Sequence, residues 1–511
     1  MPTLTDLKNK WFIPMSGNVL GVPCRRHEGG TGPQLSVSTD GNTVTPLIDG
    51  QLFMARWHAE LLSLHGAASA EFMHAGWKLN KVKTLGAAAP GTDALEDIND
   101  ADDASVETYT MACGNYANYA PNLRSIDWLR LHWVWQSCLD IRFPSRGSNH
   151  QKFTVMKSGA GALALLGSAD ISKQRWDRRA HAPVDPNRDP AAANAPTHEA
   201  GAAVAGPAVT DIEITYRDRW NDPTRTLGLR PTLPPQPRIA TLLAAPAAAG
   251  THSVQVLRTY GITTVSDGYS WSPSGEFTAW ASYLNAITKA ERYIYIEDQY
   301  VLEWGWPTPR IARTGPPRNV DIVYQLGEAL KRDVKVAIVV PSRSEDPIHV
   351  SQKFQRDLGV KYLADIAATA ASRKFVIAAL RNPPLAVFVH AKVMIVDDEF
   401  VLLGTANICQ RSMTHDGELH LGIVDQAETF AKELRKSLWA EHTGRAPAVF
   451  DNPTTGYDRF KDDTALSVHH LTPYLFDPVV FPPAPGTPQP PFGHERIMRW
   501  VDPYAGPAAL A

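Results

Sequence analysis

Two short segments of the sequence place a histidine and a lysine two residues apart. One contains His150 and Lys152, and the other contains His390 and Lys392. Because side chains alternate faces along a β-strand, each histidine projects on the same side as its lysine. Two such pairs in one pocket suit an anionic phosphodiester, whose non-bridging oxygens the lysines can hold. One histidine can attack phosphorus, and the other can protonate the leaving oxygen.

The two segments belong to a longer internal repeat. The first copy starts at residue 148 and reads SNHQKFTVMKSGAGALALLGSADISKQRW; the second starts at residue 389 and reads VHAKVMIVDDEFVLLGTANICQRSM. Each copy has an apolar strand, a turn and a second apolar strand that ends in LLG. A repeat of this length predicts two similar halves that each supply one copy of the motif.

A nucleophilic histidine needs one neutral nitrogen and a ring held in place, which a carboxylate on the other nitrogen provides. Acidic residues open an apolar segment after each motif copy. The first half offers Glu199, and the second offers Asp416 and Glu418. A solvent-facing acid at the end of a strand is the alternative interpretation for each of the three.

Four residues follow the LLG segments at matching positions. Asp170 corresponds to Asn407, and Ser168 corresponds to Thr405. An amide or hydroxyl at these positions can donate to a phosphate oxygen, and we predict that all four line the phosphate site. The two hydroxyls can instead stabilise the turn.

Strand parity separates two further motif positions from this site. Asp397 lies seven positions after His390, and Lys157 lies seven positions after His150. Because seven is odd, a regular strand sends both side chains to the face opposite the histidines. We therefore expect structural contacts for Asp397 and Lys157.

The sequence contains no HExxH segment, no aspartate-rich metal cluster and no phosphate-binding GxxxxGK[ST] loop. The predicted chemistry therefore uses lysines in place of a metal, and we expect no cofactor. The four cysteines show no metal-ligand spacing and are interpreted as buried thiols.

Apolar runs alternate with helical patterns through most of the chain, which predicts an α/β fold. A helix followed by a strand is expected in residues 49–79, 275–302 and 321–341. Loops or linkers are expected at 86–106, 221–250 and 477–493, which are rich in Ala, Gly, Asp or Pro. We therefore divide the chain into residues 1–235, residues 236–450 and a proline-rich tail, 451–511, that packs on the body.

The motif residues resemble the signature of the phospholipase D superfamily, H-x-K-x-x-x-x-D followed by G-[ST]-x-N. The second copy matches in full, with His390, Lys392, Asp397, Gly404, Thr405 and Asn407. The first copy departs from it at Lys157, in place of Asp, and at Asp170, in place of Asn. Flanking segments such as SWSPSGEFTAWASYLNAI and GPAVTDIEITYRDRWND also resemble bacterial and eukaryotic-type phospholipases D, so that the likeness covers roughly residues 45–445.

The resemblance implies two α/β halves, each a mixed sheet flanked by helices, with the active site at their pseudo-two-fold interface. It implies that His150 is the nucleophile and His390 the general acid. By motif order, Glu199 orients His150 and Glu418 orients His390, with Asp416 in reserve. The implied activity is hydrolysis of the headgroup phosphodiester of glycerophospholipids, and transfer of the phosphatidyl group to alcohols, through a phosphohistidine.

Two other functions stay open. A nuclease or another phosphodiesterase of the same superfamily would use the same motifs. A catalytically impaired protein that binds phosphate or lipid would explain Lys157 and Asp170. The formal net charge of −3 argues against a stable nucleic acid partner.

A lipid substrate would require transient contact with a membrane surface. The candidates are the region of Trp304 and Trp306 and the run SIDWLRLHWVW at 125–135, although tryptophans in a large protein mostly pack in the core. The start of the chain lacks the pattern of a secretory leader, and no apolar run is long enough to span a bilayer. We expect a monomer that is cytoplasmic or exported by a leaderless route.

Overall fold

The computed structural model describes most of the chain. The described residues are 2–26, 34–80, 93–104, 106–114, 119–142, 147–185, 187–188, 196–222, 239, 246–262, 269, 271–304, 318–342, 349–369, 374–476 and 490–502. Much of the predicted linkers 221–250 and 477–493 lies outside these ranges, and so does Trp306.

The first half of the chain forms a mixed sheet. Its main strands are β3 (Thr39–Ile48), β4 (Glu71–Gly76), β5 (Glu107–Cys113), β6 (Ser137–Asp140), β7 (Phe153–Ser158), β8 (Gly161–Gly167) and β10 (Ala200–Ala205). They lie in the order β6-β5-β4-β7-β8-β10-β3. Strands β4 and β6 run parallel to β5, and the remaining neighbours are antiparallel.

The second half repeats this arrangement. Its strands are β11 (His252–Tyr260), β13 (Tyr293–Asp298), β14 (Lys335–Val340), β15 (Phe375–Asn382), β17 (Lys392–Val396), β18 (Phe400–Gly404) and β19 (Glu418–Asp425). They lie in the order β15-β14-β13-β17-β18-β19-β11, with the same pattern of parallel and antiparallel neighbours. The predicted fold class, two similar α/β halves with mixed sheets, is confirmed.

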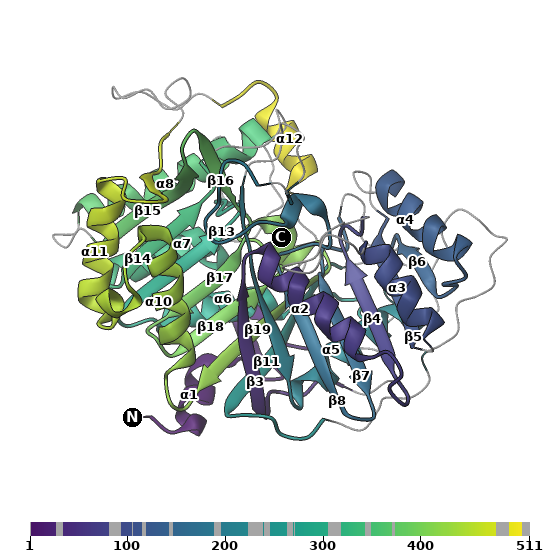
Figure 1. Ribbon diagram of the computed structural model, residues 1–511. Helices are drawn as coiled ribbons and strands as arrows, with labels where there is room; N and C mark the ends of the chain where they lie inside the picture. The colour runs from purple at the N-terminus through teal and green to yellow at the C-terminus, as the bar shows by residue number, and fades with distance from the viewer. Residues whose placement is uncertain are drawn as a thin grey trace.

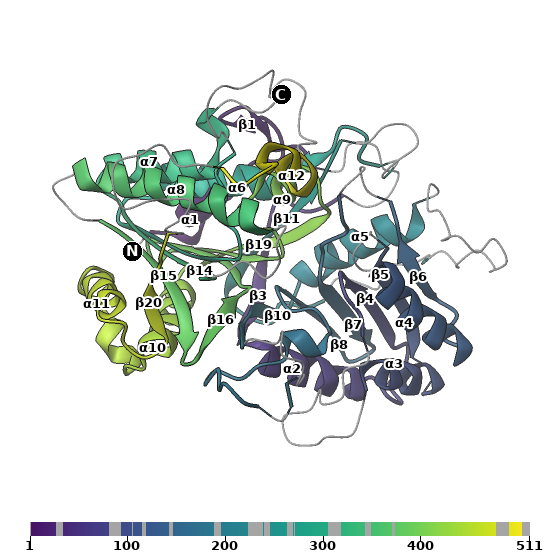
Figure 2. The same cartoon turned by 90° about the horizontal axis from the view of Figure 1, so that it is seen from above.

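Strand β3 joins the two sheets. Its first residues pair with β11, and its remaining residues pair with β10. Both ribbon views place β3 between the halves (Figures 1 and 2). The halves therefore share one continuous sheet, which holds the motif strands β7 and β17 in fixed relative positions.

Helices cover the sheet. They include α2 (Gly50–Ser63), α3 (Ala94–Asp103), α4 (Tyr119–Leu131), α5 (Ala208–Asn221), α6 (Thr278–Lys289), α7 (Ile322–Lys331), α8 (His349–Thr369) and α10 (Phe430–Thr443). The three predicted helix–strand pairs are confirmed as α2–β4, α6–β13 and α7–β14. The prediction of a loop over 86–106 is wrong, because α3 occupies much of it. The Asp93 side chain caps α3 by accepting from the Leu95 N–H, and Leu95 and Ile98 are buried.

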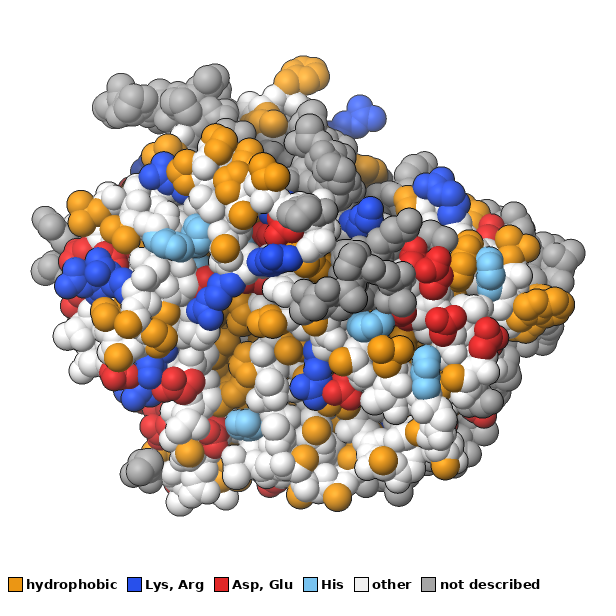
Figure 3. Space-filling model, in the orientation of Figure 1, with side chains coloured by type: hydrophobic (Ala, Val, Ile, Leu, Met, Phe, Trp, Pro, Cys, Tyr) orange, Lys and Arg blue, Asp and Glu red, His pale blue; other side chains and the backbone are white. Residues whose placement is uncertain are grey.

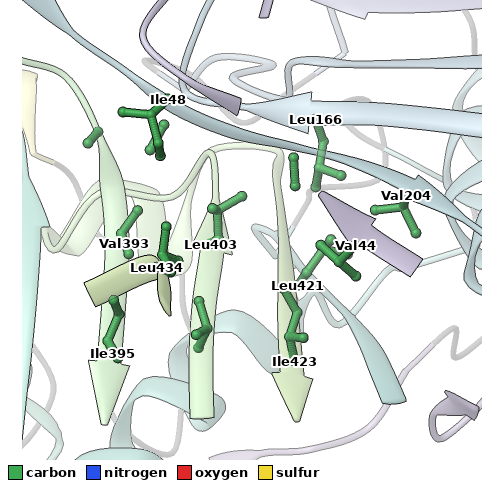
Figure 4. Close-up of a cluster of buried hydrophobic side chains, with 14 of the residues drawn as sticks. Val44, Ile48, Leu166, Val204, Val393, Ile395, Leu403, Leu421, Ile423 and Leu434 are labelled. Carbon is green, nitrogen blue, oxygen red and sulfur yellow. The ribbon is translucent and has the colours of Figure 1, made fainter. Parts of the chain in front are cut away.

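The largest apolar cluster extends across the junction of the halves. Side chains of β3, β8 and β10 meet those of β17, β18, β19 and α10 in one buried cluster, part of which Figure 4 shows. Leu166, Leu403 and Leu421 are fully buried there. Because the halves share a hydrophobic core, the geometry of a site between them is rigidly supported.

Both ends of the chain pack on the second half. Helix α1 (Leu4–Trp11) joins its apolar core, where Trp11 stacks on Phe400 at 5.5 Å, so the predicted first unit of 1–235 does not hold together at its start. The tail contributes α11 (Pro453–Ala465), β20 (Leu471–Pro473), which pairs with β15, and α12 (His494–Val501). No helix among the described residues is long and apolar enough to cross a bilayer.

Candidate active site

The two H-x-K motifs have the same local structure. Each lysine ammonium donates to the carbonyl of its own histidine, at 2.8 Å for Lys152 and 2.5 Å for Lys392. All four side chains are buried. Each lysine lies at the start of its strand or one residue before it, where the pleat sends the ammonium and the imidazole to one side.

The histidines bind glutamates of the opposite halves. His150 Nδ1 lies 3.0 Å from Glu418 Oε1, and His390 Nδ1 lies 2.9 Å from Glu199 Oε2. The prediction that Glu199 orients His150 and Glu418 orients His390 is therefore wrong. The two glutamates are bound to the histidines as expected, but the pairing crosses the interface.

Backbone pairing between the halves explains the crossing. Strand β16 (Leu385–Val389) runs parallel to β9 (Thr197–His198), and the His390 N–H donates to the His198 carbonyl at 2.8 Å. In the same way, Asn149 pairs with Gly417, and the His150 N–H donates to the Gly417 carbonyl at 2.9 Å. Each histidine is thus held beside the segment that leads to the other half's glutamate.

Hydroxyl groups complete the environment of the glutamates. Ser168 Oγ donates to Glu199 Oε2 at 2.5 Å, and Thr405 Oγ1 donates to Glu418 Oε2 at 2.5 Å. Ser412, which the sequence did not single out, donates to Glu418 Oε1 at 2.7 Å. The prediction that Ser168 and Thr405 bind phosphate is wrong, because their donors are used by the carboxylates that hold the histidines.

Asp416, the reserve candidate, bonds to neither His150 nor His390, so that prediction is also wrong. Its carboxylate accepts from the Ser148 N–H at 2.7 Å and from Arg411 Nε at 2.8 Å. The corresponding arginine of the first half, Arg175, has its Nε 3.6 Å from Glu199 Oε1. The sequence analysis missed both arginines, although a glutamine–arginine pair occurs at the matching place in each copy of the repeat.

A buried carboxylate lies near each lysine, but the halves supply it from different strands. Near Lys392 it is Asp298, at the end of β13 and directly opposite that lysine. Near Lys152 it is Asp170, after β8. The position of β4 that corresponds to Asp298 is Gly76. In the first half, Asp170 therefore supplies the nearby carboxylate that Asp298 supplies in the second.

These two aspartates also fasten the loops beside the site. Asp298 Oδ2 accepts from the Ile408 N–H at 3.0 Å, and Asp170 Oδ1 accepts from the Lys78 N–H at 2.9 Å. Asn407 is fully buried, and neither its amide nitrogen nor its oxygen bonds to a described residue. Its amide therefore remains available to a phosphate oxygen.

Residues 157 and 397 make structural contacts, as parity predicts. Lys157 is ion-paired with Glu213 of α5, on the face where Phe153 packs against Tyr216. Asp397 accepts backbone N–H bonds at 2.8 Å from each of residues 291, 292 and 293, just before and at the start of β13. Neither side chain reaches the histidines.

Burial and the surrounding cations set the charge of the site. Burial, then Lys152 and Lys392, holds the pKa of His150 well below its ordinary value, and burial, Arg175 and Lys392 do the same for His390. Burial raises the pKa of Glu199 to about 7 against Arg175 and Lys392, and burial and Asp416 raise that of Glu418 to about 8. Both imidazoles are therefore neutral near pH 7, as a nucleophile requires.

The lysines respond to the same burial. It lowers the pKa of Lys392 to about 7 against the attraction of Glu199 and Asp298, and it also lowers the pKa of Lys152. The charge of His150 acts on His390, and Lys152, Lys392 and Arg175 each act on both rings, so these five groups form one electrostatic unit. An anion bound among them would stabilise the ammonium forms.

Comparisons with known proteins agree with this geometry. A family profile described as phospholipase D matches residues 357–484, which include the second motif. Phospholipase D gamma 3 of Arabidopsis thaliana is 23% identical over 421 residues, covering 60% of this chain and 48% of that protein. Phospholipase D delta of the same plant is 30% identical over 224 residues, 34% of this chain and 26% of that protein.

Among solved structures, a phosphatidylserine synthase of Haemophilus influenzae Rd KW20 aligns with a TM-score of 0.49 and 13% identity, over 83% of this chain and 95% of that one. The chain spans about half the length of the curated relatives it matches. The profile match, the plant relatives and the duplicated motif all support the phospholipase D superfamily.

Proposed function

We propose that the protein is a phosphodiesterase of the phospholipase D type that releases the headgroup of glycerophospholipids and transfers the phosphatidyl group to alcohols. The observation that carries the proposal is the pair of neutral histidines, each fixed through Nδ1 by a buried glutamate and flanked by a lysine. No described residue bonds to Nε2 of either ring, so both nitrogens are available to a substrate.

In the first step, Nε2 of His150 attacks phosphorus and the bond to the headgroup oxygen breaks. The bound phosphodiester is an anion and favours the doubly protonated form of His390. This ring keeps its Nδ1 proton on Glu199 and gives its Nε2 proton to the leaving oxygen, so the headgroup leaves as an alcohol and not as an alkoxide. Lys152, Lys392 and Asn407 hold the non-bridging oxygens as negative charge develops. In the second step, His390 removes a proton from water or an alcohol, whose oxygen attacks phosphorus and releases His150.

The crossed pairing supports these roles, because Glu418 in its ionised form accepts from Nδ1–H of His150 and leaves the lone pair of Nε2 for attack. The position of Asp170 supports a working first motif, because it gives Lys152 one nearby carboxylate, as Asp298 does for Lys392. Gly76 stands where the second half has Asp298. On the face drawn in Figure 3, basic and acidic side chains are interspersed, which favours lipid over a polyanionic nucleic acid.

Two exposed tryptophans support transient contact with a membrane surface. Trp133 and Trp135, beyond the end of α4, are 72% and 47% exposed, with ring centroids 5.6 Å apart. Amphipathic rings of this kind enter the interface of a bilayer. Trp304, in contrast, is buried against Trp280 in the core.

The test measures choline release from phosphatidylcholine beside cleavage of single-stranded DNA, with acid-quenched samples examined for phosphohistidine. We expect choline release and a phosphoryl adduct on His150 that His150→Ala abolishes. Cleavage of DNA alone would establish a nuclease. Binding of lipid without an adduct or turnover would establish a non-catalytic protein, and full turnover by His150→Ala would refute the nucleophile.

A further inference from the structure

A second group of buried histidines and carboxylates lies one residue away from Glu199. His198 Nδ1 is 3.1 Å from Asp49 Oδ1 and 3.2 Å from Glu441 Oε1. His181 Nε2 is 3.4 Å from the same Glu441 oxygen and 3.9 Å from the same Asp49 oxygen. All four residues are buried; three come from the first half, and Glu441 comes from α10 of the second.

These spacings match the edges of a metal-ligand tetrahedron. Zn²⁺ binds histidine nitrogen and carboxylate oxygen at about 2.0–2.2 Å, which places neighbouring ligand atoms about 3.3–3.6 Å apart. The four atoms all lie within 4.8 Å of one another. Two imidazoles and two carboxylates form a ligand set that Zn²⁺ accepts.

The other nitrogen of each histidine is held by a further carboxylate. His181 Nδ1 lies 3.0 Å from Asp177 Oδ2, and His198 Nε2 lies 2.8 Å from Glu297 Oε2. Asp177 is itself fixed by Arg188 at 2.8 Å. Metal-binding histidines almost always donate their second N–H to a carboxylate or carbonyl in this way, which leaves the first nitrogen to face the ion.

Several polar atoms of the group lack ordinary partners. His181 Nε2, Asp49 Oδ2 and both carboxylate oxygens of Glu441 form no well-aligned hydrogen bond, although Arg179 Nε lies 3.2 Å from Glu441 Oε2. Asp49, the residue just before α2, has a positive φ of 66°, yet its side chain does not cap the helix. Such strain in a residue aimed at buried ligands is typical of a functional site.

A neighbouring trio fits a metal less well. Glu297 lies 2.8 Å from His198 Nε2 through one oxygen and 2.8 Å from His442 Nε2 through the other. Those distances are hydrogen bonds, shorter than the edge of a tetrahedron, and the trio offers three ligands only.

We propose that Asp49, His181, His198 and Glu441 bind one divalent transition-metal ion, with Zn²⁺ preferred, as a structural site that fastens the two halves. The site connects to the active site through the backbone. The Asp49 N–H donates to the Glu199 carbonyl at 2.8 Å, and the His198 carbonyl accepts the His390 N–H at 2.8 Å. The ion would therefore hold the segment that carries one catalytic glutamate without touching the substrate.

The experiment uses the full chain without a polyhistidine tag, stripped with a chelator, reconstituted with Zn²⁺ and freed of excess metal by gel filtration. We expect about one zinc per chain, and X-ray absorption showing only N and O ligands at about 2.0–2.1 Å. His181→Gln and Glu441→Gln should each weaken Zn²⁺ binding at least about 100-fold, and Asp177→Asn about 10–100-fold. His470→Gln is the matched control: this buried ring lies 5.3 Å from that of His181 but supplies no ligand.

Stripped wild-type protein should melt at a lower temperature and recover with one equivalent of Zn²⁺, a readout that does not depend on the folding of any variant. Two protons on the histidines are the competing way to balance the same carboxylates. Less than about 0.1 zinc per reconstituted chain, with an unchanged melting temperature, would refute the proposal and support protonated histidines instead. Zinc that His442→Gln loses and His181→Gln keeps would also overturn it.

Discussion

Replacing each glutamate by glutamine tests the crossed pairing. In the wild type, Glu418 offers one oxygen to His150 Nδ1 and Ser412, and the other to His150 Nδ1 and Thr405. Since Nδ1 lies 3.0 and 3.1 Å from the two oxygens, Glu418→Gln puts an amide nitrogen within reach of Nδ1 in either orientation. The His150 ring can then carry its proton on Nε2, and a protonated Nε2 has no lone pair with which to attack phosphorus.

Loss of the correct tautomer costs about 10³–10⁴-fold in a hydrolase that relies on a carboxylate–histidine pair, or about 4–5.5 kcal/mol of transition-state stabilisation. We expect this loss in Glu418→Gln with any leaving group, because attack on phosphorus fails. Glu199→Gln disturbs His390 instead. It should slow choline release by about 10²–10⁴-fold but slow a p-nitrophenyl phosphodiester, whose leaving group needs no proton, by less than about tenfold.

The assay compares single-turnover rates of both substrates for Glu418→Gln, Glu199→Gln, His150→Ala and His390→Ala, after circular dichroism has shown that each variant is folded. Glu418→Gln should reproduce the substrate pattern of His150→Ala, and Glu199→Gln that of His390→Ala. This comparison holds whichever histidine is the nucleophile. If each glutamate variant instead copies the histidine of its own half, the crossed geometry is wrong.

Three further predictions follow from buried or exposed groups. Lys157→Asp should keep turnover per folded molecule within about tenfold of wild type, because strand parity points the side chain away from the site. It should lower the free energy of unfolding by about 3 kcal/mol, because it places a carboxylate beside Glu213. Unchanged urea denaturation would contradict this. Burial lowers the pKa of Lys392 to about 7, so the ammonium loses its charge as pH rises through that value. The inhibition constant of sulfate should therefore rise by up to about tenfold per pH unit above it. An inhibition constant that stays the same from about pH 6 to about pH 9 would exclude this titration. Trp133→Ala with Trp135→Ala should reduce turnover on phosphatidylcholine vesicles by about tenfold and leave a monomeric short-chain substrate unaffected, whereas Leu466→Ala, at a site 75% exposed, should change neither; equal losses on both substrates would show a folding defect.

The repeat gave the architecture because it constrains the chain at many positions together. Two H-x-K motifs, each followed by paired apolar strands, specify equivalent places in two sheets, and the observed strand orders agree. Parity along a strand was also sufficient for Lys157 and Asp397, since it depends only on local geometry. The loop expected over 86–106 failed because alanine and aspartate, interpreted there as linker composition, also build a short capped helix.

The glutamate pairing was beyond a single sequence because order along the chain does not show which strands meet. Parallel pairing of β16 with β9, and of Asn149 with Gly417, joins segments roughly 190 and 270 residues apart and carries each histidine to the opposite half. Arg175 was missed for another reason. Its place beside Glu199 depends on the turn after β8, although the repeated glutamine–arginine pair was a visible signal.

The crossed arrangement also bears on whether the altered first motif is active. Both halves hold a buried glutamate, at least one hydroxyl donor to it and a neutral imidazole, although buried polar groups without a function cost stability. Here His150 and its partners Glu418, Thr405 and Ser412 are as fully bonded as His390 with Glu199. In the first half the acid near Lys152 is Asp170, and Gly76 stands at the strand position that Asp298 occupies in the second half. The departures in the first motif therefore change which carboxylate lies near Lys152, and they leave Nε2 of His150 without a bond to a described residue.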